Sequence, residues 1–375
     1  MEHFDVLLVG AGLFNAVLAH QFSMQGKKVL VIERREEIGG NCHTYECHGI
    51  DIHNYGAHIF HTSNTVIWNF ANYFAKFRQF TNSPVAMVME DGKYRAYNRP
   101  FNMNTFSQLW GCTTPSEARK TVDEATAPYI RTRYANMEEK ALSMVGPDIY
   151  EKFIKGYTEK QWHMPCTELS PSIISRIPLR FTYDNNYFNN VYQGIPEQGY
   201  TKWIENMLSD ATVRTGVDYL KHREKYDSMA DMVFYSGAVD EFFGYSEGEL
   251  HYRSLRFVHR EIHGTSNYQG VAVCNYPGLE VDHTRTIEHR HFLSPRREAV
   301  ADNDFTLVTT EYPADYVRGG EAYYPVGDAE SRALYAKYME MRPKNVVFTG
   351  RLGRFEYNDM DVTIEKALKV AEEYR

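Results

Sequence analysis

The chain has 375 residues, 43% of them hydrophobic and 24% charged, so it can bury the cores of two or three subdomains. Its formal net charge of -8 argues against nucleic acid and anionic membranes as partners, because both demand a basic face. No segment approaches the roughly 18 consecutive apolar residues of a membrane span and no leader precedes the first strand, so we expect a cytoplasmic protein with no membrane partner.

The N-terminal segment has the pattern of a strand, a glycine turn, a helix and a second strand. The apolar run 6–9 predicts a buried parallel strand, Gly10-Ala11-Gly12 follows it, and a helix leads to the apolar run 29–32. In this setting backbone N–H groups and a helix dipole face a pyrophosphate, and Glu33 is placed to bind the adenosine ribose. Asn15 replaces the third glycine of the GxGxxG motif, so either the helix lies farther from the sheet or its amide makes a hydrogen bond instead. We predict a dinucleotide site here.

A second glycine turn indicates which dinucleotide binds. Gly39 and Gly40 follow the second strand, and such a turn lets the backbone approach the pyrophosphate again. This pattern is similar to FAD-binding Rossmann proteins of the glutathione-reductase and amine-oxidase type, so the predicted cofactor is FAD. NADPH remains an alternative as a separately bound second dinucleotide, because Arg34 and Arg35 could bind a 2′-phosphate.

Cysteines and histidines gather just after this turn. The stretch 42–61 contains Cys42, His43, Cys47, His48, His53, His58 and His61. No CxxC pair is present, and a hairpin turning at His48-Gly49 would place these side chains on two faces, so we favour packing and hydrogen-bonding roles over a metal site. Five cysteines in all are typical of reduced thiols, so redox chemistry would need a cofactor.

The middle of the chain is predicted to be mainly helical. Residues 64–76 have a helical pattern, and the stretch 80–97 predicts a hairpin that turns at Asp91-Gly92. A capping box at 114–117 and an N-cap at Asn136 begin two further helices. A helical insertion therefore follows the hairpin.

The rest of the chain predicts a second sheet and a return to the first one. Alternating apolar and polar residues over 253–312 favour an antiparallel sheet separate from the first. The run 345–348 predicts a last strand. The final helix has one apolar face, made by Ile364, Ala367, Leu368 and Ala371.

Motifs along nearly the whole chain match one protein family. They lie at 39–41, 53–62, 101–106, 155–162, 176–178, 183–188, 275–276, 284–285, 323–325, 350–352 and 359–361. On these motifs the chain resembles the UDP-galactopyranose mutase family.

The resemblance, together with the element pattern, implies an α/β fold in three parts. An FAD-binding Rossmann-type parallel sheet domain would be discontinuous and comprise 1–82, 196–238 and 327–375. A helical domain with a substrate lid would comprise 101–174. An antiparallel-sheet substrate domain would comprise 83–100, 175–195 and 239–326.

The resemblance also implies a reaction. An isomerase of this family interconverts UDP-galactopyranose and UDP-galactofuranose without net redox change, by attack of the N5 atom of reduced FAD on the anomeric carbon. NAD(P)H or another reductant would be needed to reduce the flavin. A homodimer and a role in cell-surface polysaccharide biosynthesis are implied as well.

Site residues follow from the same resemblance. A departing diphosphate needs fixed positive charge, which arginine supplies better than lysine, and Arg176 and Arg285 match the family's diphosphate arginines. His58 matches the histidine beside the isoalloxazine, and these three residues are the predicted catalytic group. The predicted substrate-binding residues are Phe153, Tyr157, Trp162, Arg176, Tyr187, Asn275, Arg285, Tyr323, Tyr357 and Asp359. The predicted cofactor-binding residues are Gly10, Gly12, Leu13, Phe14, Asn15, Glu33, Arg34, Gly39, Gly40, Asn41, Gly56, His58, Ile59, Gly350, Arg351, Tyr357, Asp359 and Met360.

Several alternatives stay open. Whether Tyr323 or Tyr324 points inward is not determined, and Asn358 departs from the family's usual C-terminal motif, which leaves the sugar open. A related mutase acting on UDP-N-acetylgalactosamine or a dTDP-6-deoxyhexose would keep the same flavin and diphosphate residues. An FAD-dependent hydride-transfer oxidase is the alternative of another enzyme class, and a non-catalytic nucleotide-sensing module is the third.

Overall fold

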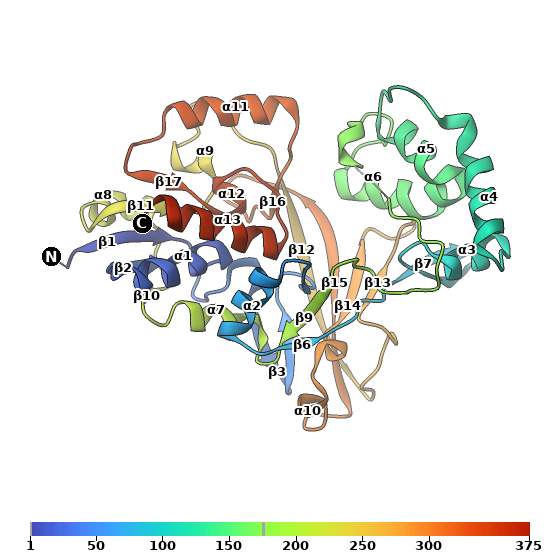
Figure 1. The fold of residues 1–375 in the computed structure, drawn as a ribbon, viewed down its shortest axis with the longest axis horizontal. Coiled ribbons are helices and arrows are strands. Elements are labelled where there is room, and N and C mark those ends of the chain that lie inside the picture. The colour runs from blue at the N-terminus through green and yellow to red at the C-terminus, as the bar shows by residue number, and fades with distance from the viewer. Residues whose placement is uncertain (1, 175–176) are drawn as a thin grey trace.

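The structure is a computed structural model that describes residues 2–174 and 177–375. A parallel sheet with its helices lies at one end of the molecule, a helical body lies at the other, and long antiparallel strands run between them (Figure 1). Both termini lie beside the parallel sheet. Within the described part of the chain, every helix is too short or too polar for a membrane span.

A five-stranded parallel sheet, built from both the N-terminal and the C-terminal parts of the chain, forms one end of the molecule. Its strands in spatial order are β10 (Thr212–Arg214), β2 (Val29–Ile32), β1 (Phe4–Val9), β11 (Ala230–Tyr235) and β17 (Val346–Phe348). Residues of β1 alternate between two cores, with Val6 and Leu8 in one and Leu7 and Val9 in the other. The strands are apolar on both faces because helices cover both, which confirms the predicted α/β class.

Helices on both faces of the sheet complete these two cores. On one face lie α1 (Leu13–Met24), α2 (Thr65–Phe74), α7 (Gly199–Met207) and α13 (Met360–Glu373). On the other face lie α8 (Arg223–Asp227), α9 (Val239–Phe242) and α11 (Ala329–Glu340). The last helix packs Ile364, Ala367 and Ala371 into the first of these cores, as its apolar face predicts.

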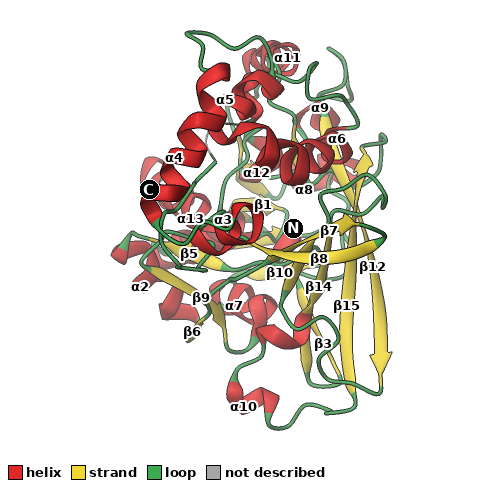
Figure 2. Cartoon of the chain, turned by 90° about the vertical axis from the view of Figure 1, so that its right-hand side faces the viewer, coloured by secondary structure: helices red, strands yellow, loops and turns green. Residues whose placement is uncertain are grey.

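A seven-stranded sheet forms the middle of the molecule. Its strands in spatial order are β16 (Tyr324–Pro325), β12 (Tyr252–His263), β15 (Phe305–Asp315), β14 (Arg285–Glu288), β13 (Val273–Asn275), β7 (Val85–Glu90) and β8 (Lys93–Asn98). Figure 2 shows the long strands β12 and β15 side by side. The predicted antiparallel pairing holds except between β13 and β7, which run parallel, so the sheet is mixed at that one pair. The β7–β8 hairpin turns at Asp91 and Gly92, both with positive φ, as predicted.

Two smaller sheets complete the strands. The hairpin of β3 (Thr44–Cys47) and β4 (Ile50–His53) turns at His48 and Gly49, as predicted. A three-stranded sheet has the order β5 (Phe60–Thr62), β9 (Tyr192–Pro196), β6 (Phe77–Gln79). Two of its strands have only three residues, which is too short for alternation to be recognised in the sequence.

The helical body follows the β7–β8 hairpin. It consists of α3 (Met103–Trp110), α4 (Pro115–Thr126), α5 (Met137–Ile149), a π-helical turn over Tyr150–Lys155 and α6 (Gly156–Trp162). The predicted capping box of Thr114 and Glu117 begins α4.

Shorter helices occur along the whole chain. They are α10 (Pro295–Glu298), α12 (Gly350–Gly353) and 3₁₀ turns over Gly40–Cys42, Ala127–Tyr129, Pro171–Ile173, Leu220–His222 and His289–Phe292.

Candidate active site

The two glycine turns meet at the start of α1. Gly12 is bridged to Gly39, and a Cβ atom added to Gly40 would lie 3.1 Å from the Cα atom of Gly12. The Glu33 carboxylate accepts the backbone N–H of Ala11 at 2.8 Å, which holds it beside the turn. Because no side chain fills the space between the glycines and the first N–H groups of α1 lie there, these residues fit the pyrophosphate and ribose of a dinucleotide.

Asn15 takes the place of the third glycine by hydrogen bonding. Its side chain is 1% exposed, and its amide donates to the carbonyl oxygens of Val9 and Gly10, both at 2.9 Å. Its Oδ1 atom accepts the hydroxyl of Thr349 at 2.8 Å, just before α12. Of the two predicted possibilities, the hydrogen-bonded one is observed, and it joins the glycine turn to the C-terminal segment.

Most predicted substrate and flavin residues line one cavity of about 1070 Å³ beside these turns. Those that line it are Asn41, Gly56, His58, Ile59, Tyr157, Trp162, Tyr187, Asn275, Arg285, Tyr323, Arg351, Tyr357, Asp359 and Met360. The other predicted cofactor residues are not among its lining, namely Gly10, Gly12, Leu13, Phe14, Asn15, Glu33, Arg34, Gly39, Gly40 and Gly350. Arg176, the predicted partner of Arg285, lies outside the described residues.

Phe153 requires a correction, because it does not reach the cavity. Its side chain is 1% exposed and packs against the rings of Tyr97 and Phe101, with centroids 5.3 and 5.4 Å away. It lies on the π-helical turn, within the core of the helical body. Tyr157 and Trp162, on the next helix, do line the cavity, whereas Phe153 is not among its lining residues.

Arg285 is held by a carboxylate that the sequence did not point to. Glu311 lies directly opposite it on β15, is 2% exposed, and accepts Nη2 of Arg285 on both carboxylate oxygens at 2.7 Å and Nε on Oε1 at 3.0 Å. Burial by itself would lower the pKa of the Arg285 guanidinium, but the Glu311 charge more than offsets it and raises that pKa. The guanidinium therefore stays charged and fixed in orientation at the cavity wall.

His58 is neutral in this site. Its ring Nδ1 lies 2.8 Å from the carbonyl oxygen of Gly56, and its backbone N–H donates to Nδ1 of His53. Burial lowers the pKa of His58 to about 4, and the nearby charges of Arg351 and Arg285 act in the same direction. With Nδ1–H donated to the Gly56 carbonyl oxygen, Nε2 is left as a hydrogen-bond acceptor.

His53 has the packing and hydrogen-bonding role expected for a histidine of this stretch. Its ring stacks on Phe292 at 4.6 Å, and its backbone N–H donates to Nδ1 of His289. Burial lowers the pKa of His53 well below its usual value. These contacts fix the loop that carries His58.

Both tyrosines of the 323–324 pair border the cavity. Tyr323 is 6% exposed and packs against the rings of Tyr55 and Phe257. Tyr324 accepts a hydrogen bond from the side chain of Gln161, and burial raises its pKa to about 12, so its hydroxyl keeps its proton. Gln161 also lines the cavity and lies within the motif at 155–162, but it is not among the predicted site residues.

The C-terminal segment closes the wall on the side of the glycine turns. Arg351 donates to the carbonyl oxygens of Tyr323 and Asn358, at 3.1 and 3.3 Å, and its guanidinium lies 4.6 Å from the ring centroid of Tyr357. Asp359 is the N-cap residue of α13. The positive end of the α13 dipole therefore faces the cavity, where it would stabilise an anion.

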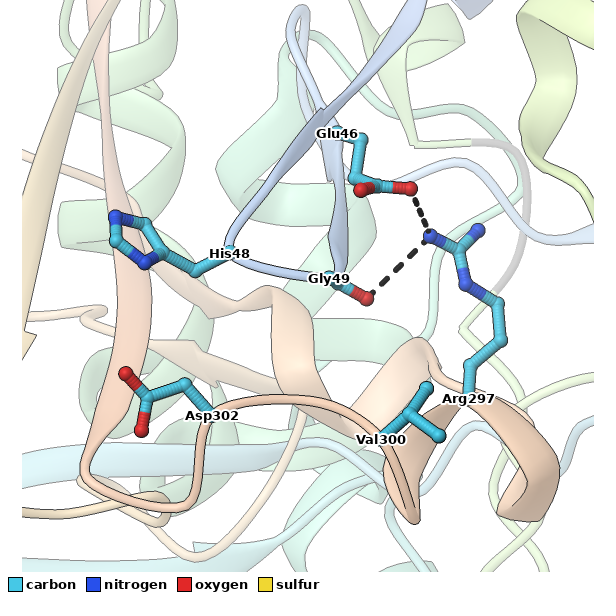
Figure 3. A pocket seen from close by; sticks show the side chains of 6 residues that line it. All are labelled: Glu46, His48, Gly49, Arg297, Val300 and Asp302. Atoms are coloured by element: carbon cyan, nitrogen blue, oxygen red, sulfur yellow. Dashed lines mark hydrogen bonds and ion pairs between the residues drawn. The ribbon is translucent and has the colours of Figure 1, made fainter.

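A second hollow shares no lining residue with this cavity within the described part of the chain. It lies between the β3–β4 turn and α10, and Figure 3 shows Arg297 reaching across it. The guanidinium donates to Glu46 at 2.8 Å and to the carbonyl oxygen of Gly49 at 3.4 Å. Because protein groups accept the hydrogen bonds of Arg297, we interpret this arginine as a structural contact that holds the β3–β4 hairpin against α10.

Comparisons with known proteins agree with the motifs. A family model described as UDP-galactopyranose mutase matches residues 152–357, and one described as an NAD(P)-binding Rossmann-like domain matches residues 8–74. A probable UDP-galactopyranose mutase of Klebsiella pneumoniae is 38% identical over 100% of this chain and 95% of the relative. A dTDP-fucopyranose mutase of Escherichia coli is 35% identical over 98% of each chain.

Solved structures with a similar fold include a UDP-galactopyranose mutase and a putative oxidase. A crystal structure of reduced UDP-galactopyranose mutase aligns with a TM-score of 0.71 at 13% identity, covering 100% of this chain and 94% of that one. A putative protoporphyrinogen oxidase from Exiguobacterium sp. 255-15 aligns with a TM-score of 0.62 at 12% identity, covering 100% of this chain and 99% of that one. At such identities these alignments indicate the fold alone.

Proposed function

The chain belongs to the UDP-galactopyranose mutase family of isomerases, and from this membership we propose that it interconverts UDP-galactopyranose and UDP-galactofuranose with reduced FAD as its cofactor. One observation carries the proposal. A single cavity joins the fixed guanidinium of Arg285, the neutral His58 and the aromatic residues of α6, beside a glycine cradle that fits a dinucleotide.

The proposed FAD would lie between the glycine turns and the cavity. Backbone N–H groups at the start of α1 would bind its pyrophosphate, and Glu33 would bind the adenosine ribose. When bound and reduced, the flavin supplies an electron-rich nitrogen as nucleophile for the anomeric carbon, so the sugar ring interconverts without net oxidation. His58 and the N-terminus of α13 would contact its ring system, and the positive end of the α13 dipole would favour its anionic form.

The proposed substrate contacts follow from charge and shape. Arg285 would bind the diphosphate of the leaving UDP through a guanidinium that Glu311 already orients, so little reorganisation is needed when the glycosidic bond breaks. Trp162 and Tyr157 offer aromatic faces for the uridine side. Tyr187, Tyr323 and Tyr357 would place hydroxyl groups on the phosphates and sugar, and Asn275 and Asp359 would add polar contacts.

A second candidate substrate is a dTDP-6-deoxyhexose. The relative of Escherichia coli named as a dTDP-fucopyranose mutase aligns over 98% of this chain. Asn358, which departs from the usual motif, lines the cavity and would lie among the groups that distinguish the sugars. The same diphosphate and flavin residues would serve either substrate.

Further parts of the proposal concern the protein's surroundings. We propose a cytoplasmic homodimer whose flavin is reduced by NAD(P)H or another reductant, and whose product enters a cell-surface polysaccharide. We propose the discontinuous division into Rossmann-type, helical and antiparallel-sheet domains as its functional organisation, and Arg176 as the second diphosphate arginine.

Turnover of the purified protein on a panel of UDP- and dTDP-sugars tests the function. The protein is assayed oxidised and after reduction with dithionite, and pyranose and furanose products are separated by chromatography. We expect interconversion of UDP-galactopyranose only after reduction, with no consumption of oxygen in step with product. Equal turnover with the flavin oxidised, or stoichiometric oxidation of the sugar, would refute it.

A further inference from the structure

Arg99 is a cavity residue that the motifs do not account for. It follows β8 directly, and its side chain lines the same cavity as Arg285 and Tyr157. Its guanidinium lies 5.1 Å from the ring centroid of Phe101, which holds the cation against an apolar surface. Among the residues that the structure describes, its guanidinium has no hydrogen-bond or ion-pair partner.

The other cavity arginines each donate hydrogen bonds to protein groups, although the buried Nε of Arg180 has no partner among the described residues. Arg285 is bound on both oxygens of a buried carboxylate. Arg180 donates to the backbone carbonyl oxygens of Asn186 and Tyr187, and Arg351 donates to two carbonyl oxygens of the C-terminal segment. A diphosphate brings negative charge that an arginine paired with Glu311 compensates only in part, so a further unpaired guanidinium in the cavity would be valuable for binding.

The charges of Arg99 and Arg285 both lower the pKa of the Tyr157 hydroxyl group. Burial raises the pKa of Tyr157, and the charges of Arg285 and Arg99 both oppose that rise. Both guanidinium groups therefore lie within electrostatic reach of Tyr157. A group bound beside this hydroxyl by Arg285 would feel the charge of Arg99 as well.

We propose that Arg99 binds the diphosphate of a nucleoside diphosphate sugar together with Arg285, an inference that rests on the proposed function. The planar, permanently charged guanidinium suits phosphate oxygens, and the face against Phe101 leaves its N–H edge available to the ligand. Arg99 is thus a determinant of affinity for the diphosphate, not for the base.

The test compares ligands that differ only in their phosphates. Binding of UDP, UMP and uridine to the full-length, flavin-loaded protein is measured by isothermal titration calorimetry for the unmodified chain, Arg99→Met and Arg99→Lys. Methionine keeps the packing on Phe101 and removes the charge. Arg95→Met is the matched control, because Arg95 lies on β8, four positions before Arg99, has a side chain that is 65% exposed and pairs with Glu90 outside the cavity.

We expect Arg99→Met to raise the Kd for UDP by about 10- to 100-fold, as for a lost charge-assisted hydrogen bond, and to leave the Kd for uridine within about twofold. Arg99→Lys should lose part of this affinity, and Arg95→Met none. Unchanged UDP binding in Arg99→Met would overturn the inference while leaving the proposed function intact, and so would an equal loss for uridine. Absence of UDP binding by the unmodified chain would overturn both.

Discussion

Replacing Glu311, the partner of Arg285, with glutamine removes the negative charge of this side chain and keeps its shape. Oε1 of Glu311 accepts two of the three short N–H···O contacts and Oε2 accepts one. An amide with its oxygen at the Oε1 position would keep two of them and would place an NH₂ group against Nη2 of Arg285. The loss is therefore one charge-assisted hydrogen bond and the charge itself, worth about 1.5–3 kcal/mol.

This loss should appear in catalysis because Arg285 is the proposed ligand of the leaving diphosphate, and a guanidinium that Glu311 no longer fixes in orientation must reorganise when the glycosidic bond breaks. We expect kcat/KM of Glu311→Gln to fall by about 10- to 100-fold, since about 1.4 kcal/mol corresponds to a factor of ten. The assay is interconversion of UDP-galactofuranose by the dithionite-reduced protein, with bound flavin measured by absorbance and Tm by thermal unfolding.

The matched control is Glu261→Gln on the neighbouring strand β12, where the carboxylate is 53% exposed and the change should be silent. A kcat/KM within about twofold of the unmodified protein for Glu311→Gln, with flavin retained, would refute the reasoning that a fixed guanidinium matters. An equal fall in the control would show that the effect is not specific to the pair.

Three further predictions concern the turn, the substrate helix and pH. Asn15→Ala should lower the free energy of unfolding by about 2–3 kcal/mol, because buried carbonyl groups and Thr349 lose their hydrogen-bond partner. It should also weaken the retention of FAD in dialysis. Unchanged stability would contradict the hydrogen-bonding role of Asn15. Gly156→Ala should raise the KM for UDP-galactopyranose several-fold while FAD stays bound, because the added Cβ would lie 2.5 Å from the carbonyl oxygen of Pro277 and push α6 outward. Lys155→Ala, at the half-exposed neighbouring position, serves as its control. His58 has a pKa of about 4, below its unfolded value near 6.5, so its contribution to stability is full above pH 6.5 and is lost as pH falls toward 4. Urea unfolding between these pH values should therefore be less steeply pH-dependent in His58→Asn, and an unchanged slope would count against a neutral, buried His58.

Features that depend on neighbouring residues could be predicted from the sequence. The turn at Asp91-Gly92 needs two residues with positive φ, and the start of α4 needs only Thr114 and the glutamate three positions later. The same holds for the first glycine turn and the strand before it. Each is decided within a few residues, so the pattern is readable without a fold.

Features that depend on register or on helix phase could not be predicted. Glu311 lies 26 positions after Arg285 and meets it only because β14 and β15 pair in one particular register. Phe153, just before the motif at 155–162, is predicted from the sequence as a substrate contact, but the π-helical turn that carries it changes the phase of the side chains before α6. That Arg99 has no side-chain partner in the part of the chain that the structure describes likewise depends on which carboxylates the fold brings near it.

By itself, the sequence determined the dinucleotide turn, the family and the set of residues from which the site is built, because local backbone geometry and recognisable motifs carry that information. Only the tertiary structure decided which of these residues share the cavity, that a buried glutamate holds Arg285, and that Arg99 lines the same cavity with no side-chain partner among the described residues. The physical reason is that electrostatic pairing and burial depend on distances through space, and strand pairing and helix packing set those distances for residues far apart in the chain.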